Sequence, residues 1–279
     1  MTFNGAPSVN LTGCSLQSNT SATCNGHNGG AFATYAVGTA GAGCSNPQSG
    51  ANAVPDTYAE LASNISRVCS GLSSTTWAAG ALLPILPGMM AVGRTGYVEY
   101  HVCGDLTLSG TGDLNGPNPL IDMVIVVENG TITFANDASI TAKRVTFVLT
   151  GANSSNHQIV FPNGNGHGAT LSLTPSINSA NPWHGIGIYQ DPALTANIDM
   201  DWGPGATANV DGVMYFPKAN VTMRGNAASN SSARGGGCTK FVTGTFTTNG
   251  NVGLDFVQTS ADCARLNVSQ YTAPVRLAR

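Results

Sequence analysis

Short apolar segments alternate with turn residues along most of the chain, most clearly from Gly185 to Asn226. This stretch contains four β-rich segments, at 185–189, 196–200, 209–216 and 219–223. Asp-Pro, Gly-Pro-Gly, Pro-Lys and Arg-Gly-Asn turns separate them, and such turns end one strand and redirect the chain. Because no apolar stripe follows the helical period of about 3.6 residues, the pattern predicts short strands.

The same rhythm continues through most of residues 103–257. Residues 131–149 contain three strand-like segments joined by corner turns, and two-residue hairpin turns are scarce. Antiparallel sandwiches also have short strands at about 8–12-residue spacing, so spacing alone does not choose between the two folds. The corner turns favour an all-β, right-handed parallel β-helix, a solenoid of stacked coils. The side chains expected inside it include Ile132, Phe134, Ile140, Val145, Phe147, Leu149, Leu171, Ile188, Val210 and Val221.

Residues 45–98 break this pattern. The segment PDTYAELASNISRV at 55–68 is the best helix candidate, with Asp56 placed to cap it. A proline- and glycine-rich tail follows, which indicates irregular structure. We expect one β-helix domain over residues 1–279, with a helical or irregular insertion at about 45–98 packed on the stack.

The composition is poor in charge: 9% of residues are charged, against about 25% in an average globular chain. Ser, Thr and Asn instead supply most of the polar surface, and a net charge of −3 gives no reason to expect nucleic acid as a partner. The seven cysteines show no CxxC spacing, which favours disulfides in an oxidising compartment over a zinc site. The longest apolar run, 78–92, is too short to span a membrane.

Glycoside hydrolysis needs two carboxylates facing the substrate, and the candidates are Asp191, Asp199, Asp201 and Asp211. Asp199 and Asp201 share a face if 198–202 is a strand. The simpler interpretation, which we favour, is that they cap turns and solvate the end of a strand. The possible bases of a lyase are isolated from any acidic cation site, namely Arg144, Lys218 and Arg224. His167 and His184 lie in glycine-rich turns without a nucleophile motif, and the GNGHG run at 164–168 lacks the Lys-Ser/Thr of a phosphate loop. We therefore expect no enzyme activity, no catalytic residues, no cofactor and no metal.

An ice- or carbohydrate-binding face is a third possibility. It needs a regular array on one flat side, and Thr131, Thr133, Thr141 and Thr146 do not share one spacing. Trp77, Trp183 and Trp202 are expected to fill the core or corners, whereas two coplanar exposed rings would indicate glycan binding. A glycan-binding or glycan-cleaving β-helix remains the alternative function.

Several blocks carry a family resemblance: CGDLTLSG (103–110), VENGTITFANDASITAKRVTFVLTG (127–151), GIGIYQD (185–191) and VDGVMYFPKANVTMRGN (210–226). Together with the opening VNLTGCSLQSN, they resemble the C-terminal region of TadG-like proteins of the bacterial tight-adherence (Tad) pilus system. The resemblance covers nearly the whole chain.

The resemblance implies an exported envelope protein with a β-helical body and an N-terminal membrane tether, located outside the cell or at its surface. Because no such tether is present, we expect the chain to be the exposed portion of a longer protein. The implied function is a non-catalytic structural or adhesive component of a surface or pilus apparatus. Its expected partners are other envelope or pilus subunits or a surface, with glycans as the alternative.

The resemblance also places Cys69 and Cys103 on either side of the insertion, so we expect a bond between them. A Cys238–Cys263 bond would close a loop of about 25 residues and cap the last strands, contributing roughly 3 kcal/mol in the chain-entropy model. Only one pair can form among Cys14, Cys24 and Cys44, and we expect Cys14 to be part of it.

Overall fold

The protein is all-β, with 50% of the residues in strands and 5% in helices. The computed structural model describes residues 1–25, 32–71, 73–79, 89–115, 121–152, 157–162, 167–195, 197–231 and 237–268. Its strands form sheets of ten, seven, four and three strands, and the ten- and seven-stranded sheets are called sheet A and sheet B below. Among the pairings between the described strands, only that of β8 with β9 is antiparallel.

Sheet A has the order β4-β1-β23-β21-β18-β15-β12-β9-β8, with β19 paired to β21. Its strands are β1 (Thr2–Phe3), β4 (Thr23–Cys24), β8 (Met89–Arg94), β9 (Tyr97–Val102), β12 (Met123–Glu128), β15 (Val145–Thr150), β18 (Ile186–Gln190), β19 (Ile198–Trp202), β21 (Gly212–Arg224) and β23 (Thr239–Asn249).

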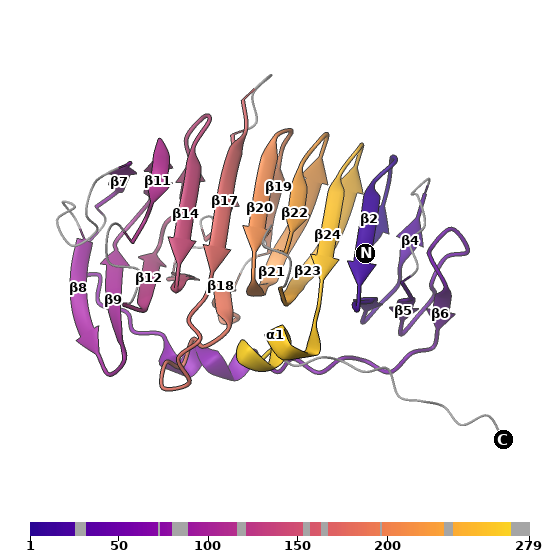
Figure 1. Cartoon of the computed structure of the whole chain (residues 1–279), viewed down its shortest axis with the longest axis horizontal. Coiled ribbons are helices and arrows are strands. Elements are labelled where there is room, and N and C mark those ends of the chain that lie inside the picture. Colours follow the sequence, from indigo (N-terminus) through magenta and orange to yellow (C-terminus); the bar gives the residue numbers. More distant parts are fainter. Residues whose placement is uncertain are drawn as a thin grey trace.

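Sheet B has the order β11-β14-β17-β20-β22-β24-β2, and these strands lie side by side in Figure 1. They are β2 (Ser8–Thr12), β11 (Thr111–Asp113), β14 (Ser139–Lys143), β17 (Ala169–Thr174), β20 (Ala206–Val210), β22 (Ala228–Asn230) and β24 (Gly253–Val257). The four-stranded sheet contains β7 (Thr75–Ala78), β10 (Leu106–Ser109), β13 (Ile132–Phe134) and β16 (Ile159–Val160), and the three-stranded sheet contains β3 (Leu16–Ser18), β5 (Thr34–Ala36) and β6 (Pro47–Ser49).

The chain visits these sheets in turn. It runs from β12 in sheet A through β13 in the four-stranded sheet and β14 in sheet B, and returns to sheet A as β15, which pairs in parallel with β12. The three strands expected within residues 131–149 are therefore confirmed. Asp137 (φ 58°) and Arg144 (φ 57°) adopt the left-handed conformation at the two corners that flank β14. At the corner before β13, a side chain on Gly130 would collide with the backbone carbonyl of Gly104, which explains the need for glycine.

The beginning and the end of the chain lie side by side. β1 pairs with β23 and β2 pairs with β24, while β5 and β6 lie beyond them at one end of the molecule (Figure 1). β3 pairs with β5. Residues 50–71, called the strap below, then run back toward β7 and β8 along the lower edge of the molecule in Figure 1. Part of the range 45–98, which the sequence predicts to be an insertion, belongs to the sheets, because β6, β7 and β8 are each paired with a neighbouring strand. The strap lies in the same range but outside the sheets.

The α-helix expected at 55–68 is wrong in type and length. The strap contains a 3₁₀ helix, η1 (Ala59–Asn64), and its N-cap Tyr58 makes no side-chain capping bond. Asp56 instead accepts a hydrogen bond from the Tyr58 N–H and another from the Tyr215 hydroxyl, so it ties the strap to sheet A. The sequence analysis also missed a short helix, α1 (Ser260–Arg265), which Thr259 caps through the Asp262 N–H.

The interior is built from in-register ladders of apolar side chains. Ile125, Phe147 and Ile188 lie opposite one another on β12, β15 and β18. All ten side chains expected inside are at most 2% exposed, which confirms that part of the prediction. The turn expected at Pro217 and Lys218 is wrong, because β21 continues through it with a shift of register against β23.

The central strands of sheet A, β12, β15 and β18, are covered on both faces. Outward side chains of sheet A form a second apolar cluster with the strap and α1, including Val126, Val148, Tyr189 and Tyr215, with Tyr58, Leu61 and Ile65 of the strap packed on it. The rings of Tyr189 and Tyr215 stack at 4.9 Å. Burial on both faces explains why β12 and β15 are apolar or buried at every position, whereas strands of sheet B alternate.

Candidate functional site

The cysteines form three disulfides, Cys24–Cys44, Cys69–Cys103 and Cys238–Cys263, which indicate an oxidising, non-cytoplasmic environment. The second and third are the pairs expected from the sequence. The expectation that Cys14 belongs to the remaining pair is wrong, because Cys14 is free. Its thiol lies near the carbonyls of Thr12 and Phe256, whereas a bridge between Ala22 and Ala40 brings Cys24 and Cys44 to a Cα separation of 5.0 Å.

Asp199 and Asp201 point outward from the same face of β19, as expected, but each has a partner on the neighbouring strand. The Asn220 side chain donates to Asp199 over 2.9 Å, and Arg224 makes a forked ion pair with Asp201. Asp199 is therefore hydrogen-bonded and Asp201 ion-paired across two strands, an arrangement more typical of a cross-strand ladder than of a hydrolytic acid and base. Their role is structural, as expected, but both lie within β19 instead of capping a turn.

The remaining candidates do not converge on one site. Asp191 is buried and accepts hydrogen bonds from Arg67 of the strap and from the Thr150 hydroxyl, and Asp211 is also buried. Arg144 is paired with Asp122, and His167 with Asp137. His184 hydrogen-bonds the Arg265 carbonyl, and the backbone N–H of Lys218 donates to the Gln190 side chain. Residues 164–166 of the glycine-rich run lie outside the described residues.

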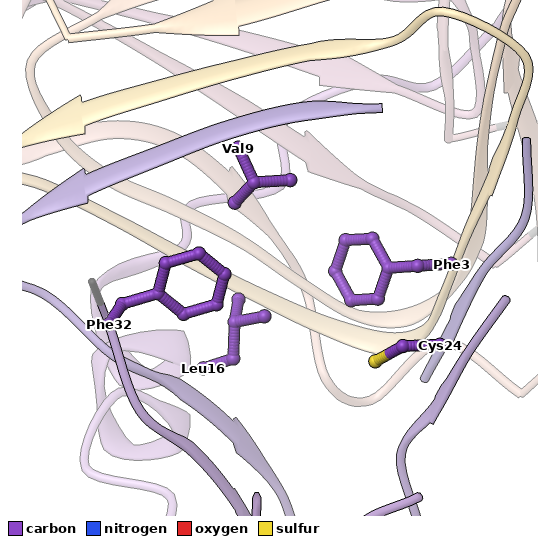
Figure 2. A pocket seen from close by; sticks show the side chains of 5 residues that line it. All are labelled: Phe3, Val9, Leu16, Cys24 and Phe32. Carbon is purple, nitrogen blue, oxygen red and sulfur yellow. The ribbon is translucent and has the colours of Figure 1, made fainter. Parts of the chain in front are cut away.

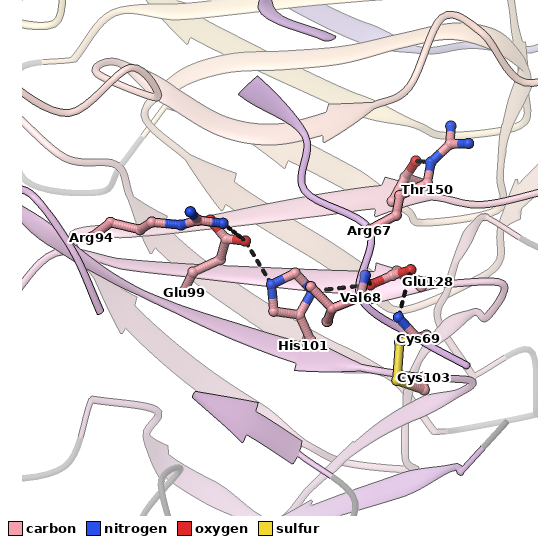
Figure 3. A network of polar contacts seen from close by, with 9 residues as sticks. All are labelled: Arg67, Val68, Cys69, Arg94, Glu99, His101, Cys103, Glu128 and Thr150. Carbon is pink, nitrogen blue, oxygen red and sulfur yellow. Dashed lines mark hydrogen bonds and ion pairs between the residues drawn. A yellow bond between two sulfur atoms is a disulfide. The ribbon is translucent and has the colours of Figure 1, made fainter. Parts of the chain in front are cut away.

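A buried cluster that the sequence analysis missed lies beneath the strap on β9 and β12 (Figure 3). We call Glu99, His101 and Glu128 the Glu–His–Glu cluster. His101 is fully buried, with Nε2 2.6 Å from Glu99 and Nδ1 3.0 Å from Glu128. Arg94 on β8 donates to both carboxylate oxygens of Glu99.

The cluster joins the strap to sheet A. The backbone N–H groups of Val68 and Cys69 donate to the two carboxylate oxygens of Glu128, beside the Cys69–Cys103 bond (Figure 3). Burial opposes charge on His101, but hydrogen bonds and attraction from both glutamates outweigh it and raise the pKa of His101. Burial likewise opposes charge on Glu99, but His101 and Arg94 outweigh it and lower the pKa of Glu99. The hydrogen-bonding groups of the cluster are occupied by one another, by Arg94 and by the strap, so the contacts that the structure shows hold the strap in place.

The outer face of sheet B is the broadest repetitive surface that we identify. Strand pairing aligns two rows of outward side chains, which we call the polar face: Thr111, Ser139, Thr170, Thr207, Ala228, Gly253 and Ser8 in one row, and Asp113, Thr141, Ser172, Asn209, Asn230, Asp255 and Asn10 in the other. All are exposed or half-exposed, while the residues between them point into the core.

Hydrogen bonds between neighbouring strands fix several side chains of the polar face. Asn230 donates to Asn209 over 2.9 Å, and Asn10 donates to Asp255 over 2.8 Å. This face was missed because the four threonines tested for a common spacing, Thr131, Thr133, Thr141 and Thr146, do not all lie on one surface. Thr141 lies on sheet B, Thr133 lies on the four-stranded sheet, and Thr146 is buried on sheet A.

The aromatic and cavity evidence points away from a sugar-stacking pocket. Trp77, Trp183 and Trp202 are all buried to 1% exposure or less, as expected for core or corner residues. Figure 2 shows a small apolar space near the N-terminal strands, which is too narrow for a water molecule. It is lined by Phe3, Val9, Leu16, Cys24 and Phe32. Over the described part of the chain, no three His, Cys, Asp or Glu side chains are arranged to hold a metal ion.

In comparisons with known proteins, no family model, no curated protein and no solved structure matches this chain. A search of the described residues for a helix long and apolar enough to cross a membrane finds none.

Proposed function

We propose that the chain is a non-catalytic structural or adhesive component of a bacterial surface or pilus-associated apparatus, related to the TadG-like proteins. The observation that carries this proposal is the polar face of sheet B, a weakly charged surface that runs over seven strands. Low charge reduces the desolvation penalty when such a surface meets a partner. Its partners on this proposal are other envelope or pilus subunits, or a surface.

The body on which this face lies is, on the same proposal, a right-handed parallel β-helix formed by residues 1–279 as one domain. Two features support it. Among the described strands, all pairings except that of β8 with β9 are parallel, and from β9 to β18 the chain passes three times through sheet A, the four-stranded sheet and sheet B in that order. Pairing of β1 and β2 with β23 and β24 supports one domain. The three disulfides support export, so the proposed location is extracellular or at the cell surface.

A glycan-cleaving function has less support. The best acid–base candidates, Asp199 and Asp201, are engaged by Asn220 and Arg224, and the Glu–His–Glu cluster is buried beneath the strap. A hydrolase would need one carboxylic acid and one carboxylate facing an open substrate position.

Two measurements test the proposal. The purified chain is incubated with polyuronates, neutral plant polysaccharides and peptidoglycan, and the gene is deleted in the source bacterium and surface attachment is scored. We expect no bond cleavage above a protein-free blank and a loss of attachment in the deletion strain. Cleavage that disappears in Asp199→Ala or Asp201→Ala would overturn the proposal, as would unchanged attachment after deletion.

A further inference from the structure

The centre of the polar face is uncharged. Across β14, β17, β20 and β22, the aligned side chains are Ser139, Thr141, Thr170, Ser172, Thr207, Asn209, Ala228 and Asn230. Charged side chains flank this centre: Lys143, the next outward residue of β14 after Thr141, pairs with Asp113 of β11 over 3.4 Å, and Asp255 accepts from Asn10. A surface with this charge distribution matches a neutral partner, because an anionic polymer would find no compensating cations at its centre.

The same face presents a two-dimensional array of donors and acceptors. Neighbouring strands are about 4.8 Å apart, and alternate residues along a strand are roughly 6.6 Å apart. Hydroxyl and amide groups can both donate and accept, so the array can bond a partner that repeats hydroxyl groups. Bonds such as Asn230 to Asn209 hold side chains in place before contact, which reduces the entropy lost on binding.

Among the partners named in the proposed function, the regular spacing of the face favours a repeating surface. Seven strands spaced by about 4.8 Å, each about five residues long, span a flat area of roughly 450 Å². A regular polymer surface can use a patch of this size, because many protein molecules adsorb to it independently and each meets the same repeat.

From these observations we propose that the polar face binds a neutral, hydroxyl-rich polysaccharide presented as a flat, packed surface. This deepens the proposed adhesive function and rests on it. Recognition occurs through hydrogen bonds between sugar hydroxyls and the Ser, Thr and Asn side chains. Ring stacking plays no part, because the three tryptophans of the chain are buried.

The test is adsorption of the full chain to microcrystalline cellulose and to chitin powder. Thr170 lies between Ser139 and Thr207 on sheet B, and Thr107 has an equivalent half-exposed position between Thr76 and Thr133 on the four-stranded sheet. Thr170→Arg places a long charged side chain at the centre of the polar face, and Thr107→Arg is the matched control. Asn209→Arg serves as a second variant if Thr170→Arg fails to fold, as judged by thermal melting.

We expect the wild type to adsorb to at least one of the two powders, with an apparent affinity that falls at least tenfold in Thr170→Arg and less than twofold in Thr107→Arg. Absence of adsorption to both powders would overturn the inference, as would equal losses in the two variants. Retention on growing ice without retention on either powder would instead assign the face to ordered water and also overturn it.

The attachment assay separates this inference from the proposed function. If the deletion strain loses attachment but Thr170→Arg adsorbs like the wild type, the polysaccharide inference fails and the adhesive function stands. If Thr170→Arg loses adsorption while deletion leaves attachment unchanged, the adhesive function fails and the binding face stands.

Discussion

Replacing Glu128 by alanine tests whether the Glu–His–Glu cluster holds the strap. The Glu128 carboxylate is buried and accepts from the ring of His101 and from the backbone N–H groups of Val68 and Cys69. Glu128→Ala removes all three contacts and leaves His101 with Glu99 as its remaining acidic partner.

The expected loss follows from these contacts. Breaking a buried ion pair by removing one partner costs about 3–5 kcal/mol, and the lower end applies because Glu99 still compensates His101. With an unfolding entropy of about 2.1 cal/mol/K per residue, 1 kcal/mol shifts the Tm of a chain of 279 residues by about 1.7 °C, so Glu128→Ala is expected to lower Tm by roughly 5 °C. Glu128→Gln keeps an acceptor oxygen for the strap but loses the charge, and its effect should be intermediate.

Calorimetry with disulfides intact measures the shift. The matched control is Asp113→Ala, which removes a carboxylate from a half-exposed ion pair with Lys143 and should cost about 0–1 kcal/mol. If the Tm of Glu128→Ala equals that of the Asp113→Ala control, the cluster does not hold the strap and the reasoning is refuted.

Three further predictions concern single side chains. Because the pKa of His101 is raised in the folded protein, His101 stabilises the fold fully below its unfolded pKa of about 6.5, and this stabilisation is lost as the pH rises through its folded pKa. The difference in Tm between the wild type and His101→Gln should therefore narrow above pH 6.5, and a widening difference would contradict this. Burial raises the pKa of Cys14 to about 12, so about one thiol in ten thousand is ionised at pH 8; a thiol reagent should label the native chain slowly and the denatured, unreduced chain once, and fast native labelling would count against it. Phe147 is 1% exposed, so Phe147→Ala should cost about 3–5 kcal/mol in urea unfolding and Phe147→Leu much less, whereas equal costs would show that the site collapses around the cavity.

The interior could be predicted from the sequence because its signal is local. Along β14 and β17, apolar and polar residues alternate, so the inward positions of Ile140 and Leu171 follow from the period of two. The corner residues between strands carry a similar local signal. These short-range patterns were enough to place all ten core side chains correctly.

The long-range arrangement carries no comparable local signal. Pairing of Asn10 with Asp255 joins residues 245 positions apart, and the Cys24–Cys44 bond depends on how two loops meet after folding. The strap was mistaken for a helix because its Ala and Leu residues have helical propensity, although packing on sheet A decides its conformation.

One signal in the sequence could have revealed the covering of sheet A. The runs MVIVVE in β12 and VTFVLT in β15 lack the alternation seen in sheet B. Continuous apolar runs are typical of strands buried on both faces. Comparing the continuous runs with the alternating ones would have distinguished the covered sheet from the open sheet before the structure was known.

The difference between the two sheets has a consequence for the polar face. The strap carries the chain from β6 back toward β7 and β8, and the later strands then lead to β24, which pairs with the N-terminal strand β2 (Figure 1). β2 therefore extends sheet B by one further strand. The bond from Asn10 to Asp255 crosses this junction, so the row of amide and carboxylate groups continues from the end of the chain to its beginning. Substitutions beneath the strap on sheet A and substitutions on the polar face of sheet B should therefore have separable effects. The first lower the stability of the fold, and the second change the binding surface while leaving the core intact.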